Sequence, residues 1–117
     1  MKIKTQDLIG AALDWAVAKC EGFEVAFTTN EEVMILREGV TDYFDPHRNW
    51  GWGGPIVERM LKDGLLVYAL PETSRWIASV DKPSRFFHGP TLLIAAMRCY
   101  VASKLGDEVD VPDELLS

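Results

Sequence analysis

Three stretches of the sequence carry apolar residues at the three- and four-residue spacing of an amphipathic helix. They predict helices over residues 6–21, 55–63 and 90–105. A glycine, which is typical of the left-handed residue that ends a helix, follows each stretch: Gly22, Gly64 and Gly106. The third pattern is the most regular, and its apolar stripe consists of Leu92, Leu93, Ala96, Met97, Tyr100 and Val101.

The first predicted helix has an unusually wide apolar face. Its polar groups are confined to a narrow line formed by Asp7, Asp14 and Glu21. Thr5 precedes the helix and is expected to cap its N-terminus. A helix with so wide a face is covered on more than one side, either by the rest of the domain or by a second subunit. We therefore expect a homo-oligomer.

The second predicted helix begins at Pro55, because proline needs no backbone donor at a first helical position. Ile56 and Val57 begin its buried face, and since both are β-branched, a short strand remains the alternative here. Residues 45–54, which precede this helix, form a predicted loop that is dense in glycine, tryptophan and polar side chains.

Four shorter segments have the alternation or the apolar runs of β-strands: residues 23–27, 33–36, 65–70 and 76–80. The last two flank a turn-like Pro-Glu-Thr-Ser sequence, and this spacing predicts an antiparallel hairpin. Helices and strands do not alternate regularly along the chain. We therefore expect an α+β fold in which a small antiparallel sheet packs with three helices, like an α-β-α sandwich.

The length of 117 residues leaves room for one domain, which we place at residues 1–106, followed by an acidic tail over residues 107–117. The net charge is −6, and five acids lie within residues 107–114, whereas the rest of the chain is close to neutral. We expect the tail to be solvated. Because a near-neutral body lacks the clustered basic side chains that nucleic acids require, we do not expect a nucleic-acid partner.

Cysteine usage and the apolar runs favour a cytoplasmic protein. Cys20 and Cys99 both fall in predicted helices and do not form a Cys-x-x-Cys pair, so free, packed thiols are expected. The N-terminal residues lack the apolar core of a secretory signal. The longest apolar run, within residues 92–96, is far too short to span a bilayer.

The common catalytic and cofactor motifs are missing from the sequence. It has no phosphate-binding loop, dinucleotide fingerprint, zinc-protease motif or serine-hydrolase motif. His47 and His88 lie far apart, and with the two cysteines they lack the paired spacing of a zinc site. We expect no metal, no cofactor and no catalytic residue.

Three long segments resemble a known family. They are LIGAALDWAVAKCEG (8–22), NWGWGGPIVER (49–59) and HGPTLLIAAMRCYVASKLGDEVDVP (88–112). In this order they resemble the NinX-like family of phage and prophage proteins, a domain of unknown function among lambdoid phage accessory genes. The order of elements more distantly resembles a phage α-β-α sandwich domain. The resemblance implies a phage accessory protein in the bacterial host cell, and it supplies no activity.

A candidate ligand site comes from the two glycine-rich helix starts. A helix start exposes unpaired N–H groups at the positive end of the helix dipole, and glycine lets a ligand approach the backbone. If the second and third helices start side by side, they form a pocket for an anion or a nucleotide. Tryptophans would stack on a ring, and arginines would hold phosphate. The expected ligand-binding residues are Asn49, Trp50, Trp52, Gly53, Gly54, Glu58, Arg59, Gly89, Thr91 and Arg98.

Each of these residues also has a structural interpretation. Glycine followed by proline is common at a helix start, tryptophan fills cores, Asn49 can cap a turn, and Arg98 can be a solvated or salt-bridged helix residue.

Three functions follow from these observations. The leading hypothesis is a non-enzymatic protein that binds a host component, such as a small anionic ligand or a nucleotide. The alternative is a protein-interaction module that inhibits or redirects a host protein through residues 45–54, because tryptophan and arginine are enriched at interaction hot spots. The weakest hypothesis is an enzyme acting on a nucleotide or a small metabolite.

Overall fold

The computed structural model describes residues 1–80 and 85–116. Within these ranges it has three α-helices, α1 (Gly10–Glu21), α2 (Trp50–Lys62) and α3 (Leu92–Leu105), and two short 3₁₀ helices, η1 (Thr5–Asp7) and η2 (Asp113–Leu115). The strands form three separate antiparallel sheets. The predicted α+β class is confirmed, with three small sheets in place of one.

Two of the sheets are three-stranded meanders, and the third joins the two ends of the described chain. The first meander consists of β2 (Glu24–Thr28), β3 (Val33–Arg37) and β4 (Val40–Tyr43). The second consists of β5 (Leu66–Leu70), β6 (Arg75–Ser79) and β7 (Phe87–Gly89). The third sheet pairs β1 (Lys2–Lys4) with β8 (Glu108–Asp110). The predicted β5–β6 hairpin is confirmed. The sequence patterns did not indicate β1, β7 or β8, which have three residues each and are too short to show a period, nor did they indicate the fully exposed four-residue strand β4.

The first helix starts later than its apolar pattern suggests. Gly10 has a φ of 57°, a left-handed conformation that interrupts a right-handed helix. Residues 5–7 therefore form the separate helix η1. The predicted Thr5 cap is wrong, because the Thr5 hydroxyl donates a 2.6 Å hydrogen bond to the Gly106 carbonyl instead. At its other end the helix stops as predicted, at the left-handed Gly22.

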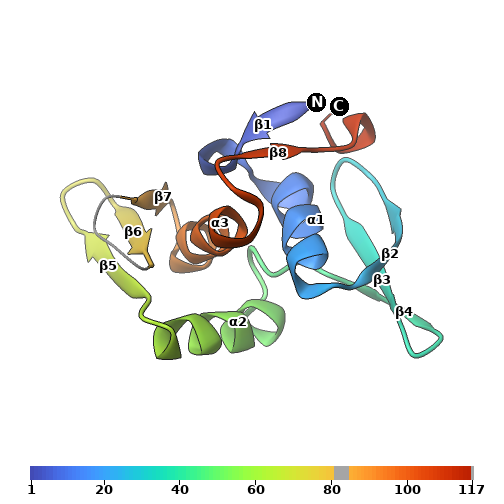
Figure 1. Cartoon of the computed structure of the whole chain (residues 1–117), viewed down its shortest axis with the longest axis horizontal. Helices are drawn as coiled ribbons and strands as arrows, with labels where there is room; N and C mark the ends of the chain where they lie inside the picture. The colour runs from blue at the N-terminus through green and yellow to red at the C-terminus, as the bar shows by residue number, and fades with distance from the viewer. Residues whose placement is uncertain (81–84, 117) are drawn as a thin grey trace.

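The third helix forms the centre of the molecule (Figure 1). α1 and α2 pack against it, and the β5–β6–β7 sheet covers a further side. α1 also packs on β2 and β3. The wide apolar face of α1 is thus covered within the same chain and no longer argues for a second subunit. The oligomeric state stays a prediction, which light scattering would check.

The acidic C-terminal segment packs onto the rest of the protein. β8 pairs with β1, and Val109, Val111 and Leu115 are buried. The acidic side chains between them remain exposed to solvent. Residues 107–116 therefore contribute apolar side chains to the core while keeping their carboxylates in water. Ser117, the last residue of the predicted tail, lies outside the described residues.

Candidate functional site

The structure places the start of α2 inside the predicted loop. α2 begins at Trp50, and the Asn49 side chain caps it by accepting a 2.8 Å hydrogen bond from the Gly51 N–H. The Gly-Gly-Pro sequence at residues 53–55 therefore lies within the helix, which corrects the predicted start. The alternative strand at residues 56–57 is wrong for the same reason. An asparagine cap fixes a helix start by satisfying a free N–H.

The first turn of α2 lies against the first turn of α3, and protein atoms fill the junction. A Cβ atom added to Gly53 would come within 2.7 Å of the Leu93 side chain and of the Pro46 carbonyl oxygen. A Cβ atom added to Gly89 would come within 2.7 Å of the Ala95 backbone nitrogen. These two glycines thus allow close packing of protein segments, and the space beside them is already occupied.

The other predicted residues near α3 have structural partners. Thr91 caps α3 by accepting a 3.1 Å hydrogen bond from the Ile94 N–H. Arg98 is buried, and it donates to the carbonyl oxygens of Leu8 at 2.8 Å and His88 at 2.7 Å. Burial lowers the pKa of the Arg98 guanidinium from its ordinary value. Arg98 therefore joins α3 to β7 and to the segment before α1.

Glu58 and Arg59 lie on the exposed side of α2. The Arg59 guanidinium donates to a Glu21 carboxylate oxygen at 2.6 Å, and the Tyr100 hydroxyl donates to the same oxygen at 2.5 Å. The Glu21 carboxylate raises the pKa of Arg59, whereas burial and this same carboxylate raise the pKa of Tyr100. The cluster ties the end of α1 to α2 and α3.

The two tryptophans of the predicted site have different surroundings. Trp50 is 55% exposed on the first turn of α2. Trp52 is half-buried: its ring contacts Phe44 edge-on, the Arg37 guanidinium lies 5.1 Å from the ring centre, and its Nε1 donates to the Tyr43 carbonyl at 2.9 Å. The faces of the Trp52 ring are thus largely engaged by the protein, and Trp50 is the more open of the two rings.

Asn49 and Trp52 line a cleft of about 400 Å³ between α1, the β3–β4 hairpin and α2. We call it the acidic cleft, because five carboxylates reach it: Asp14, Glu31, Glu32, Asp42 and Asp45. Its aromatic wall comes from Tyr43, Phe44 and Trp52. Arg48 is the one cation among the described lining residues, and its Nε already donates to Asp45 at 3.0 Å.

A buried carboxylate–imidazole pair lies beside the acidic cleft. Asp14 is 1% exposed, its Oδ2 lies 2.6 Å from Nδ1 of His47, and its Oδ1 accepts from the His47 backbone N–H at 3.0 Å. Burial raises the pKa of Asp14, and the hydrogen bonds from His47 oppose this rise. Sequence reasoning missed the pair. The signal was Asp14 itself, a charged residue in the apolar segment 11–18, because a buried carboxylate needs a partner.

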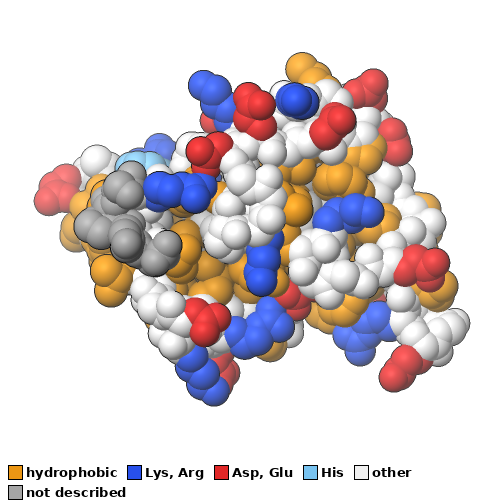
Figure 2. Space-filling view, in the orientation of Figure 1, with side chains coloured by type: hydrophobic (Ala, Val, Ile, Leu, Met, Phe, Trp, Pro, Cys, Tyr) orange, Lys and Arg blue, Asp and Glu red, His pale blue; other side chains and the backbone are white. Residues whose placement is uncertain are grey.

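The acidic cleft belongs to a wider acidic region. Between residues 23 and 45 six side chains are acidic and one, Arg37, is basic. In Figure 2, acidic and apolar side chains alternate along the right-hand edge, where β2, β3 and β4 lie in Figure 1. The near-neutral balance of residues 1–106 hides this region, because most of the bases lie elsewhere in the chain.

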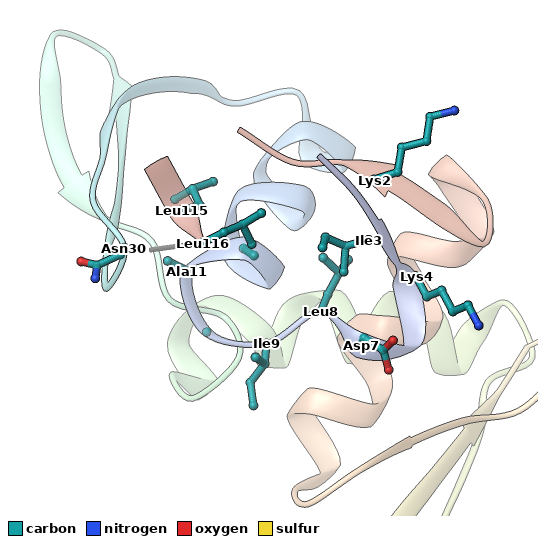
Figure 3. Close-up of a pocket in the computed structure, with 12 residues that line it drawn as sticks. Lys2, Ile3, Lys4, Asp7, Leu8, Ile9, Ala11, Asn30, Leu115 and Leu116 are labelled. Atoms are coloured by element: carbon teal, nitrogen blue, oxygen red, sulfur yellow. The ribbon is translucent and has the colours of Figure 1, made fainter. Parts of the chain in front are cut away.

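A second cavity, of about 610 Å³, lies at the start of α1 (Figure 3). Leu8 and Leu115 are among its apolar lining, and Lys2 and Lys4 extend outward at its rim. Of the three α-helices in the described ranges, α1 is the one without a side-chain cap, since its N-cap residue is Ile9. Sequence reasoning placed this helix start four residues too early and so missed the cavity.

The cysteines are free, as predicted. Burial raises the pKa of both Cys20 and Cys99 to about 11. A thiol with such a pKa stays protonated near neutral pH and is a poor nucleophile. In the described parts of the chain, no three His, Cys, Asp or Glu side chains are grouped so as to hold a metal ion.

Within the described ranges, two α-helices packed on a central α3, with three short antiparallel sheets, define a small α+β protein. No helix within residues 1–80 and 85–116 has the length and apolar composition needed to cross a membrane. The chain belongs to the family described as Bacteriophage P22, NinX, whose model matches residues 4–104. This confirms the resemblance seen in the sequence and identifies a phage accessory protein. A search of curated proteins found no match.

Proposed function

We propose that this phage accessory protein is a non-enzymatic interaction module that binds a host protein by accepting a basic side chain in the acidic cleft. The observation that carries the proposal is the charge of the cleft. Five carboxylates line it, and its one described cation, Arg48, is already paired with Asp45. A lysine or arginine of a partner would meet the exposed carboxylates of the β2–β3 turn and β4. The proposal places the protein in the cytoplasm of the host cell.

The depth of the cleft strengthens this electrostatic argument. Exposed carboxylates such as Glu32 and Asp42 would steer a basic partner toward the cleft, and their effect would weaken with salt. Asp14 is buried, and an opposite charge brought near a desolvated carboxylate interacts more strongly than it does in water. The aromatic wall of the cleft also suits the apolar stem of a lysine or the planar head of an arginine.

The same charges argue against an anion in this cleft. A phosphate group would be repelled by the carboxylates that line it. The two arginines expected to hold phosphate are engaged elsewhere, Arg59 with Glu21 and Arg98 with two backbone carbonyls. The acidic cleft therefore favours the interaction-module hypothesis over a nucleotide pocket between α2 and α3.

The test uses hexalysine and hexaglutamate as probes, with binding measured by calorimetry and by amide chemical shifts. We expect hexalysine to bind with steep salt dependence and to shift the amides of residues 31–32, 42–45 and 47–49, and hexaglutamate not to bind. The double variant Glu32→Gln/Asp42→Asn should weaken hexalysine binding about fivefold. The matched control Glu58→Gln/Glu72→Gln removes the same charge elsewhere and should change little. Equal affinities of the two double variants would refute the proposal.

The cavity at the start of α1 supports a second candidate, a small anionic ligand. Free N–H groups at an uncapped helix start attract anions, and Lys2 and Lys4 lie at the rim of this cavity. We expect pyrophosphate or a nucleotide to raise the melting temperature of the protein. A Lys2→Gln/Lys4→Gln variant should lose that shift. No shift with either anion would remove this candidate.

A further inference from the structure

The β2 strand contains an irregularity that turns a large aromatic side chain toward solvent. Val25 pairs with Ile35, and the next pair joins Phe27 to Met34, so Ala26 is an extra residue in β2. Ile35 is buried and faces the core. Regular alternation after Val25 would place Phe27 on that same inner face. The bulge instead places it opposite Met34 on the outer face, where it is 55% exposed.

Phe27 is the end of an apolar row that crosses the outer face of the sheet. Met34 pairs with Phe27 on one side and with Tyr43 on the other. Tyr43 is 57% exposed, and Met34 is half-buried. The neighbouring row on the same face joins Leu36 to Glu24 and Thr41. Directly paired side chains in an antiparallel sheet lie close together, so these residues form one surface.

This surface is continuous with the acidic cleft and carries its charge. Tyr43 belongs both to the apolar row and to the cleft wall. Glu31 and Glu32 lie in the turn that follows Phe27, and Glu24 lies on the outer face itself. Arg37, the one base between residues 23 and 45, packs over the Trp52 ring. The apolar row formed by Phe27, Met34 and Tyr43 thus lies beside the carboxylates of the turn and of the cleft.

We propose that the outer face of the β2–β3–β4 sheet, anchored by Phe27, docks a host protein that presents an apolar side chain flanked by lysine or arginine. The inference rests on the proposed function, since one of those basic side chains would enter the acidic cleft. A second copy of this chain would bring a second acidic region close to the first and would be repelled. A polyanion would be repelled as well, and a small free cation would leave the aromatic row exposed.

The test compares hexalysine with a peptide of the same charge that carries a leucine and a tryptophan between its lysines. We expect the amphipathic peptide to bind at least tenfold more tightly and to shift amides of Phe27, Met34 and Leu36 that hexalysine leaves unchanged. Phe27→Ser should abolish this gain without changing hexalysine binding. Leu66→Ser is the matched control, because Leu66 is 67% exposed on another sheet, and it should have no effect.

The outcomes separate the two proposals. Failure of hexalysine to bind refutes the proposed function and, with it, the docking inference. If hexalysine binds but the amphipathic peptide binds no more tightly, the docking inference alone is overturned. Equal effects of Phe27→Ser and Leu66→Ser on the amphipathic peptide would overturn it too.

Discussion

The junction of α2 with α3 and the acidic cleft both use residues from the start of α2. Gly53 faces the junction, where Leu93 and the Pro46 carbonyl leave no space for a Cβ atom. Asn49 and Trp52, from the same turn, face a cleft of about 400 Å³. Residues a few positions apart thus either pack against protein atoms or line an open site. Composition alone does not separate these roles, because the surroundings of each residue in the fold decide between them.

Buried Arg98 and the acidic cleft also differ in how their charges are paired. Arg98 lies where α3 meets β7 and the segment before α1, and it donates to two backbone carbonyls there. In the acidic cleft most carboxylates are exposed, and the buried one, Asp14, is matched by His47. The charge of Arg98 is satisfied within the fold, whereas the carboxylates of the cleft exceed what the described part of the protein pairs. The predictions below test this difference, in order of decreasing expected effect.

The largest effect is expected from Arg98→Met. The variant keeps much of the side-chain volume but leaves the carbonyl oxygens of Leu8 and His88 without this donor. We expect the free energy of unfolding to fall by about 3 kcal/mol, measured by urea denaturation. Binding of hexalysine to the folded variant should be unchanged. A fall below about 1 kcal/mol would mean that Arg98 is not a structural link and would reopen a ligand role.

Gly53→Ala should have the next largest effect. The added Cβ atom would meet Leu93 and a backbone carbonyl oxygen at 2.7 Å, and the carbonyl cannot easily move away. We expect a loss of about 2 kcal/mol in the free energy of unfolding, because overpacking exceeds the gain in helix propensity. Thermal and urea unfolding check this. An unchanged stability would show that the junction has room and would weaken the contrast with the cleft.

The fold could be predicted from the sequence wherever the spacing of apolar residues repeats over many positions. The patterns of α1 and α3 each cover three turns or more, and the β5–β6 hairpin shows both alternation and a turn. The first turn of α2 could not be predicted from the sequence, because glycine and tryptophan are poor helix formers. The helix starts there because Asn49 caps it and Gly53 packs closely against other segments. The outward turn of Phe27 depends on one bulge, which alternation does not anticipate.

The acidic cleft was less predictable than the fold, because it is assembled from segments that are distant in sequence. Asp14 comes from α1, Glu31 and Glu32 from a turn, and residues 42–52 from the approach to α2. The ligand-binding prediction included Asn49 and Trp52 but grouped them with helix starts rather than with carboxylates. Summing charge over residues 1–106 also concealed the acidic region between residues 23 and 45.

Asp14→Asn should reveal a pH dependence of stability that belongs to the cleft. The folded pKa of Asp14 is raised above its ordinary 3.8, chiefly by burial, so the folded state holds this proton more tightly than the unfolded state. The free energy of unfolding of the wild type, relative to that of the variant, should therefore fall as the pH rises from 3.8, the ordinary pKa, through the raised pKa of the folded state. We expect a fall of about 1 kcal/mol, measured by urea denaturation from about pH 4 to about pH 7. A relative stability that rises over this range would contradict the assignment.

The smallest effect, and the one of opposite sign, is expected from Gly54→Ala. A Cβ atom at this position would lie 3.6 Å from the Trp50 ring, an ordinary contact, whereas at the neighbouring Gly53 it would clash. Both glycines lie in the interior of α2, where alanine is the better helix former. Gly54→Ala should therefore raise the free energy of unfolding by about 0.5–1 kcal/mol and leave hexalysine binding unchanged. Equal destabilisation by Gly53→Ala and Gly54→Ala would mean that this turn needs glycine for its flexibility. The close packing of Gly53 would then not be what distinguishes the junction from the cleft.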